Sequence, residues 1–184
     1  MRIAYFAMLA LFLAAAPAEA AAWKTDPAKS SLGFTGSLSG SPFDGQFKRW
    51  QAEIEFDPAK PEAGHALVTI DMASATTGDS QQDQALPNSD WFDVKGFPQA
   101  KFEAASFHAK GGNAYEAVGA LTIRGMRKDV VLPFILDLQG ATAHAKGRLT
   151  ILRTDYGVGQ GAWASGQMVG LEVAVTVDLT ATRQ

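Results

Sequence analysis

The three histidines are the residues of this chain best suited to hold a metal ion or to act as a general base. His65, His108 and His144 are scattered, and no spacing among them suggests a shared ion. Because a zinc site needs three or four convergent ligands, we expect no metal centre. His65 follows a turn glycine and His144 falls on the polar face of an expected strand, so we interpret all three as surface residues.

The sequence contains no recognisable motif for nucleophilic catalysis. A Ser/His/Asp triad is recognised by geometry, so the sequence alone does not exclude one, but the chain has no Gly-x-Ser-x-Gly turn. It also has no cysteine, which excludes a thiolate nucleophile, disulfides, cysteine-ligated zinc and iron–sulfur clusters. The run Gly157-x-Gly159-x-Gly161 resembles a phosphate loop only superficially, because no helix is expected after it. We interpret it as a flexible hairpin and expect no catalytic site and no cofactor.

Arg153 is the charged residue best placed to contact a ligand. It has the same parity as the apolar side chains of an expected strand at 143–151, so it could meet a polar group at the mouth of a cavity. It could equally pair with Asp155 or Asp90 and hold loops together, and we favour this structural role. Arg124 lies in an expected hairpin turn, where we expect it to be solvated.

Strands, rather than helices, must position these side chains. Apolar residues recur at every second position, and helical periodicity is almost absent. Short connections rich in Gly and Pro favour antiparallel neighbours, and the polar stretch 78–96 could hold a short helix around 81–86. The alternation predicts about eight strands, at 30–34, 50–57, 66–72, 100–104, 115–123, 130–139, 143–151 and 172–179.

Eight antiparallel strands with one apolar face each can close into a barrel or split into a sandwich. Several inner positions are small: Ala100, Ala104, Ala117, Gly119, Ala143, Ala145 and Gly147 share apolar faces with larger residues. A core packed to normal density would fill such positions, so they could leave room for a ligand. Larger residues opposite them could also fill the space, and the pattern leaves both interpretations open.

Composition and the N-terminus indicate an exported, folded protein. With 47% hydrophobic and 19% charged residues the chain is not disordered, and a net charge of −3 without a basic block argues against nucleic-acid binding. Residues 1–20 read as a signal peptide, with cleavage after Ala20 or Ala22, which leaves one domain at 21–184. The alternative is a membrane anchor, but the apolar run 3–16 would span only about 21 Å of a roughly 30 Å hydrocarbon core. We therefore expect a periplasmic protein.

Five motifs in order along the chain resemble the YceI-like family of exported bacterial proteins. The resemblance covers nearly all of 23–183, and two positions depart from the usual pattern: Pro87, where a basic residue is common, and Ala75, where a bulkier aliphatic is common. The motifs are Trp23-x-x-Asp26-Pro27-x-x-Ser30, Phe56-Asp57-Pro58, Asp83-x-x-Leu86 with Asp90-Trp91-Phe92-Asp93, Gly119-x-Leu121-Thr122-x-x-Gly125, and Arg153-x-Asp155-Tyr156-Gly157.

The resemblance implies a single eight-stranded, antiparallel, lipocalin-like barrel with a short helix or loop as a lid. It also implies non-enzymatic binding, sequestration or transport of a long-chain isoprenoid, isoprenoid quinone or similar amphiphilic lipid. An alternative is an accessory role beside a membrane cytochrome-b-type partner; a homodimer and an enzyme acting on a lipid stay open. The residues expected to contact ligand, rather than only to pack the core, are Phe34, Phe47, Trp50, Phe56, Phe102, Ala117, Leu121, Phe134, Leu149 and Arg153.

Overall fold

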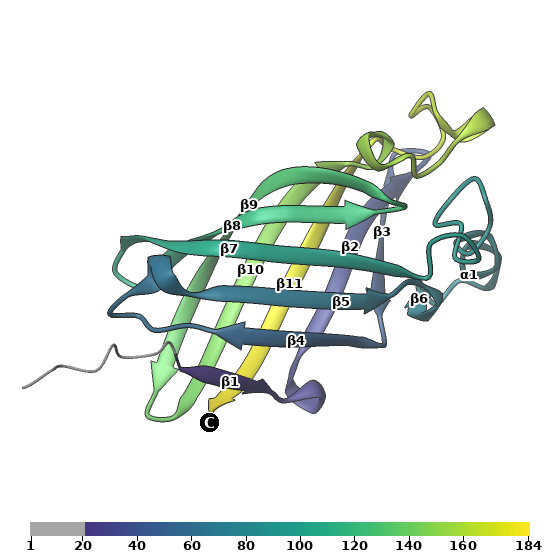
Figure 1. Ribbon diagram of the computed structural model, residues 1–184. Helices are drawn as coiled ribbons and strands as arrows, with labels where there is room; N and C mark the ends of the chain where they lie inside the picture. The colour runs from purple at the N-terminus through teal and green to yellow at the C-terminus, as the bar shows by residue number, and fades with distance from the viewer. Residues whose placement is uncertain (1–20) are drawn as a thin grey trace, which may run out of the picture.

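The computed structural model describes residues 21–184, and the chain folds into one closed, all-antiparallel β-barrel (Figure 1). The expected signal peptide, residues 1–20, lies outside the described residues. Eight strand positions form the barrel, and the eight-stranded antiparallel architecture expected from the sequence is confirmed. Five positions hold one continuous strand each: β7 (Gln99–Gly111), β8 (Ala114–Ile123), β9 (Met126–Gln139), β10 (Thr142–Leu152) and β11 (Glu172–Arg183).

The other three positions are each interrupted. They hold β1 (Ala22–Thr25) with β2 (Ser31–Leu38), β3 (Ser41–Phe47) with β4 (Trp50–Glu55), and β5 (His65–Asp71) with β6 (Ala75–Thr76). The barrel closes because β11 pairs with β2 through its first half and with β1 through its last residues. Proline explains the first interruption: Pro27 has no N–H to donate to a ladder, and residues Pro27–Lys29 form a 3₁₀ turn.

The period-two pattern located the strands well where side chains alternate between the core and solvent. It missed β3, whose Pro42 and Gly45 are poor strand formers and which the sheet nevertheless pairs with β2. It also ended β7 at 104, because a bulge between Ala104 and Ser106 shifts the register against β8 and reverses the alternation beyond it.

The connections follow the expectations only in part. The short helix expected around 81–86 is α1 (Ser80–Ala85), with Asp79 as its N-cap. The segment between β10 and β11 was expected to be a flexible hairpin, and this expectation is wrong. It is a long connection containing two 3₁₀ turns, Arg153–Tyr156 and Gly161–Trp163, which cover one end of the barrel (Figure 1).

Candidate functional site

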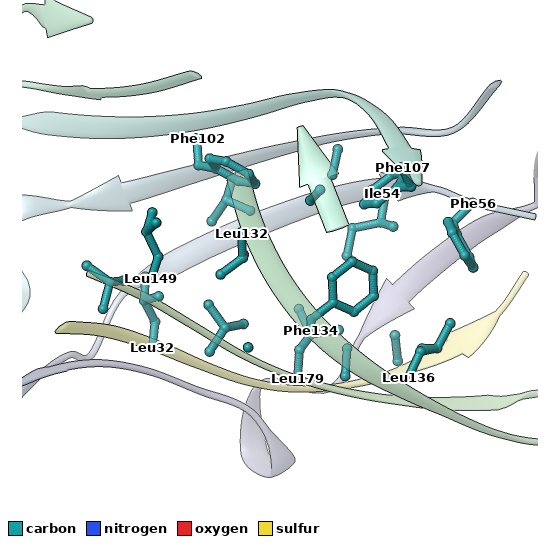
Figure 2. A pocket seen from close by; sticks show the side chains of 18 of the residues that line it. Leu32, Ile54, Phe56, Phe102, Phe107, Leu132, Phe134, Leu136, Leu149 and Leu179 are labelled. Carbon is teal, nitrogen blue, oxygen red and sulfur yellow. The ribbon is translucent and has the colours of Figure 1, made fainter. Parts of the chain in front are cut away.

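The barrel encloses a main cavity of about 160 Å³. All eight strand positions contribute side chains to its wall, and every one of them is aliphatic or aromatic. Figure 2 shows most of these side chains pointing from the strands into a common space. An apolar cavity of this kind stays dry and accepts apolar ligands. The small residues Ala117, Ala143, Ala145 and Gly147 all line it, so the interpretation that small inner residues leave room is correct at these four positions.

Not every small inner residue has this role. At Gly119 an added Cβ would lie 1.9 Å from the Glu103 carbonyl oxygen, because the β7 bulge brings the two backbones together. Glycine there permits a close approach of strands and does not enlarge the cavity. Neither Gly119 nor Ala104 lines the main cavity.

Aromatic rings close the main cavity at the end formed by the β7–β8 and β9–β10 hairpins. Phe56 packs edge-on against Phe107 and Tyr115, with ring centroids 5.1 and 5.5 Å apart. Phe134 contacts the same two rings, at 6.0 and 5.6 Å. The indole N–H of Trp23 donates a 2.9 Å hydrogen bond to the Phe56 carbonyl oxygen, so the polar atom of this tryptophan has a partner.

A second apolar cavity, of about 110 Å³, continues the interior towards the opposite end. The two cavities share four lining residues, Leu32, Ile70, Leu121 and Val175. This ring of side chains forms a waist between them. Together the two spaces make an elongated apolar interior along the barrel.

Two loops cover the second cavity. Leu86, Trp91 and Phe92 come from the segment after α1, and Tyr156 and Val158 come from the β10–β11 connection. The sequence motif containing Trp91 and Phe92 therefore plugs the end of the barrel. The two unusual family positions lie beside this cover: the carbonyl of Pro87 accepts from the Val94 N–H at 3.0 Å, and Ala75 pairs with Phe47.

Arg153 fastens this cover through hydrogen bonds to backbone carbonyls. Its Nε donates to Gly170 (2.9 Å), one Nη to Val158 (2.8 Å) and Gly159 (3.0 Å), and the other Nη to Val169 (2.8 Å) and Trp163. A guanidinium has five N–H donors, so all are used. The side chain is 3% exposed, and burial lowers its pKa.

This arrangement corrects the expected alternatives for Arg153. No ion pair within residues 21–184 includes it, so neither Asp155 nor Asp90 is its partner. Its guanidinium also has no N–H left for a ligand head group. The face of Trp91, 5.6 Å from the guanidinium carbon, adds a cation–π contact. The structural role favoured from the sequence holds, but carbonyl oxygens provide it.

The glycine run at 157–161 is shaped by this arginine. Gly159 has φ = +77°, and an added Cβ would lie 2.0 Å from Nη1 of Arg153. The Gly159 and Gln160 N–H groups both donate to the Asp90 carbonyl, at 2.7 and 2.8 Å, which joins the two covering loops. Residues 157–161 therefore surround the Arg153 guanidinium in one defined conformation.

Two further polar contacts hold the lid segment. Arg124, expected to be solvated, instead donates from Nη1 to the carbonyls of Ser89 and Trp91. Asp83 accepts from the Thr76 hydroxyl at 2.6 Å and from the Thr77 N–H at 2.6 Å. These hydrogen bonds, led by that from Thr76, lower the pKa of the Asp83 carboxyl, and they tie α1 to β6.

The comparison with protein families decides what kind of barrel this is. The family model for the YceI-like domain matches residues 23–181. The chain belongs to the YceI-like family. The crystal structure of BcnA from Burkholderia cenocepacia, another barrel of this kind, is 38% identical with a TM-score of 0.84, and covers 86% of this chain and 100% of its own.

Two other similar proteins have lower sequence identity. A UPF0312 protein of Pseudomonas putida is 29% identical over 182 residues, which is 92% of this chain and 94% of the relative. A polyisoprenoid-binding domain from Saccharophagus degradans shares the fold, with a TM-score of 0.70 at 15% identity over 89% of this chain and 99% of that one.

All ten expected ligand contacts line the interior of this YceI-like barrel. Arg153 does so within the covering loops, and whether each residue contacts a ligand stays a prediction. Leu121 belongs to both cavities. The main cavity contains Trp50, Phe56, Phe102, Ala117, Leu121, Phe134 and Leu149, and the second contains Phe34, Phe47, Leu121 and Arg153.

Sequence reasoning missed other residues that line the main cavity. Leu132, Leu136 and Val177 follow the same alternation as residues that were chosen, so the pattern itself could have identified them. Phe107 also lines the cavity, but it lies beyond the β7 bulge, where the parity of inward positions changes. Simple alternation from Phe102 would place its side chain outside.

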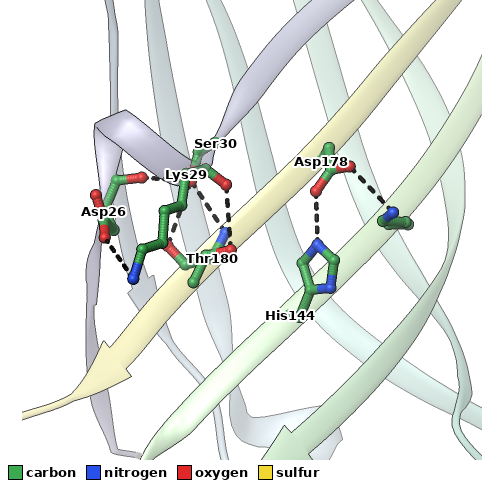
Figure 3. Close-up of polar contacts among 7 residues, drawn as sticks. Asp26, Lys29, Ser30, His144, Asp178 and Thr180 are labelled. Carbon is green, nitrogen blue, oxygen red and sulfur yellow. Dashed lines mark hydrogen bonds and ion pairs between the residues drawn. The ribbon is translucent and has the colours of Figure 1, made fainter.

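The histidines lie away from this interior. His144 Nε2 lies 2.6 Å from Asp178 Oδ1 on the outer side of β10 and β11 (Figure 3). Desolvation acts to raise the pKa of Asp178, but hydrogen bonds from His144 and Lys146 outweigh it and lower this pKa. Within residues 21–184 no group of three or more potential metal ligands comes together. In the same part of the chain, no helix has the length and apolar character to cross a membrane.

Proposed function

We propose that this YceI-like protein binds a long-chain isoprenoid, an isoprenoid quinone or a similar amphiphilic lipid in the periplasm. The observation that carries the proposal is the interior of two neighbouring cavities that share four apolar side chains and are lined almost entirely by apolar residues. Each CH₂ group moved from water into such a space gains about 0.8 kcal/mol. A long chain therefore binds without a charged anchor, and the protein sequesters or carries it without chemical change.

Two further observations support this ligand class and location. The Saccharophagus degradans domain, whose fold this barrel shares, is described as polyisoprenoid-binding. The N-terminal sequence has the features of a signal peptide, which supports export. Free diffusion of an isoprenoid through water is disfavoured by the same burial energy that favours binding, so a carrier in an aqueous compartment has a clear physical role.

A matched pair of variants tests where the chain lies. Leu121 forms part of the waist between the cavities, whereas Thr122, its neighbour in β8, lines neither. Leu121→Trp should fill the waist and weaken binding of a fluorescent polyprenyl probe at least tenfold, while Thr122→Trp should leave the affinity within twofold. Equal affinity of both variants, each folded by circular dichroism, would contradict binding in the interior.

A second position tests the main cavity alone. Ala117 is a small residue facing Leu132 across the β8–β9 pair, and both line this cavity. Ala117→Trp should therefore exclude the probe from the main cavity. The alternative of a membrane cytochrome-b-type partner, and the homodimer that the sequence left open, stay untested predictions. Co-purification from mild detergent would test the partner.

A further inference from the structure

The barrel wall has an opening at its side, between two strand positions. β1 pairs with β4 only through Ala22 and Trp23, and β2 pairs with β3 only from Gly33 onward. Between these ladders, residues 24–32 and 47–53 lie on either side of a groove of about 940 Å³. No strand pairing joins the two segments there. This lateral groove is thus bordered by backbone on both sides.

The turn between β1 and β2 forms one border of the lateral groove, and its hydrogen bonds to β11 hold it away from the opposite border. The Asp26 N–H donates to the Thr180 carbonyl at 2.8 Å, and the Thr180 N–H donates to Ser30 Oγ at 3.0 Å. The Thr180 hydroxyl donates to the Lys29 carbonyl at 3.1 Å. Figure 3 shows this turn attached to β11. The Trp23-x-x-Asp26-Pro27-x-x-Ser30 motif therefore builds the edge of the groove.

The opposite border of the lateral groove, residues 47–53, is hydrogen-bonded to the segment on its far side, away from the first border. At the break between β3 and β4, the Lys48 N–H donates to the Ser74 carbonyl at 3.2 Å, and the Arg49 N–H donates to Ser74 Oγ at 3.0 Å. The Arg49 carbonyl accepts from the Asp71 N–H at 3.0 Å. Ser74 itself is buried. Because each border is hydrogen-bonded to the strand on its far side, the groove is a built feature of the wall.

The lateral groove lies directly against the interior. Trp23, Trp50 and Ile54 line both the groove and the main cavity, and Phe47 lines both the groove and the second cavity. Trp50 is half-buried and packs against the apolar clusters of both halves of the barrel. These shared side chains, Trp50 among them, separate the groove from the interior.

The chemistry of the lateral groove differs from that of the cavities. Lys24, Lys48 and Gln51 line it, and neither lysine belongs to an ion pair within the described part of the chain. The hydroxyl oxygen of Thr25, another lining residue, is buried without a hydrogen-bond partner. Two carboxylates, Glu53 and Glu55, also line the groove, and Glu55 lies 3.7 Å from His65. Beside these carboxylates, Lys24, Lys48 and Gln51 offer hydrogen-bond donors to an oxygen-rich group.

An amphiphile needs a polar place beside the apolar one, because a buried polar group without a hydrogen bond is unfavourable. At the loop-covered end the Arg153 guanidinium does not supply such a place, since every one of its N–H groups is already bonded. The lateral groove offers one, next to Trp50. We propose that the lipid enters the barrel sideways through this groove, past Trp50, and leaves its oxygen-rich head group there.

This inference rests on the proposed lipid binding, and exchange kinetics test it separately from affinity. Removing the Trp50 indole should open the passage, so Trp50→Ala should load and release a fluorescent polyprenyl probe at least fivefold faster than the unmodified protein. Trp163→Ala removes a similar side chain from the loop-covered end, where it contacts Trp91 and lines neither cavity. Its exchange rates should stay within twofold. The opposite ranking would place the entrance at the loop-covered end.

Blocking the groove gives an independent test that leaves the interior intact. Because the chain has no cysteine, a single introduced cysteine can be labelled alone with a bulky maleimide. A label at Gln51→Cys should slow loading at least tenfold. Labels at Lys101→Cys, on the outside of β7, and at Ser165→Cys, in the β10–β11 connection, should have no effect.

The equilibrium amount of bound probe separates the two proposals. If entry is lateral, the labelled Gln51→Cys protein loads slowly but reaches the same occupancy when given time or when loaded before labelling. Unchanged loading after labelling at Gln51, or slow loading after labelling at Ser165, overturns the lateral entrance while lipid binding stands. Failure of the unmodified protein to bind any probe overturns both.

Discussion

At the end of the barrel formed by the β7–β8 and β9–β10 hairpins, four aromatic rings on strands and their edges close the interior. At the opposite end, two loops close it. One buried guanidinium binds carbonyls of the β10–β11 connection, and the Gly159 and Gln160 N–H groups join this connection to the Asp90 carbonyl of the other loop. The first closure depends on area removed from water, which tolerates changes of shape. The second depends on directional bonds, whose loss leaves buried carbonyls unpaired. The two ends should therefore respond differently to small substitutions.

The largest expected effect comes from removing the guanidinium. Arg153→Met should lower the free energy of unfolding by about 4 kcal/mol, because it leaves buried carbonyl oxygens without donors. Arg153→Lys keeps the charge but not the planar fork, and should recover less than half of the loss. Urea denaturation measures both. A loss below about 1 kcal/mol for Arg153→Met would show that the loops close the end without it.

The next effect concerns the backbone around that guanidinium. Gly159→Ala combines a positive φ with a clash against Arg153, and should cost about 2 kcal/mol. Gly161→Ala is the matched control, because Gly161 also has a positive φ, of +60°, but no atom lies within 4 Å of its added Cβ. It should cost about 1 kcal/mol. Equal losses in thermal unfolding would mean that the close approach to Arg153 is unimportant.

The aromatic end should be more tolerant. Phe56→Leu keeps an apolar side chain against Phe107 and Tyr115, and should cost about 1 kcal/mol. It should leave hydrogen exchange in the loop-covered end unchanged, since the two apolar clusters have no buried residue in common. A loss as large as that of Arg153→Met would remove the distinction between the two ends.

The smallest expected effect is a loosening of the lid in acid. Because the pKa of Asp83 is lowered in the folded protein from its ordinary 3.8, its stabilising effect is complete above that value. It disappears as the pH falls below 3.8 through the lowered pKa. Amide exchange of the α1 residues should therefore accelerate below about pH 4. Asp83→Asn should show fast exchange already at pH 7 and little change with pH; a pH response equal to that of the unmodified protein would exclude Asp83 as the cause.

The sequence predicted what depends on alternation and missed what depends on individual contacts. The antiparallel strands and the inward positions of Phe102, Leu121 and Phe134 follow from period-two patterning. The choice of a barrel over a sandwich came from the resemblance to the YceI-like family. The position of Phe107 does not, because a one-residue bulge reverses the pattern. The strand β3 contains Pro42 and Gly45, so pairing with β2 rather than intrinsic preference forms it.

The hydrogen bonds of Arg153 and the lateral groove could not be predicted from the sequence, for a different reason. Backbone carbonyls accept all the hydrogen bonds of Arg153. Because every residue has a backbone carbonyl, residue types in the sequence do not reveal such partners. The search for a carboxylate near Arg153 therefore looked for the wrong acceptor. The lateral groove likewise depends on which strand Asp26 and Ser30 bond to, and this pairing becomes visible only when the barrel is closed.

Native mass spectrometry of the folded protein, after incubation with a total bacterial lipid extract, tests the central claim most directly. The expected result is a one-to-one complex whose released ligand is an isoprenoid or isoprenoid quinone, with the complex absent in Leu121→Trp and retained in Thr122→Trp. A protein that stays free of lipid, or one whose lipid is retained by both variants alike, would contradict binding within the barrel.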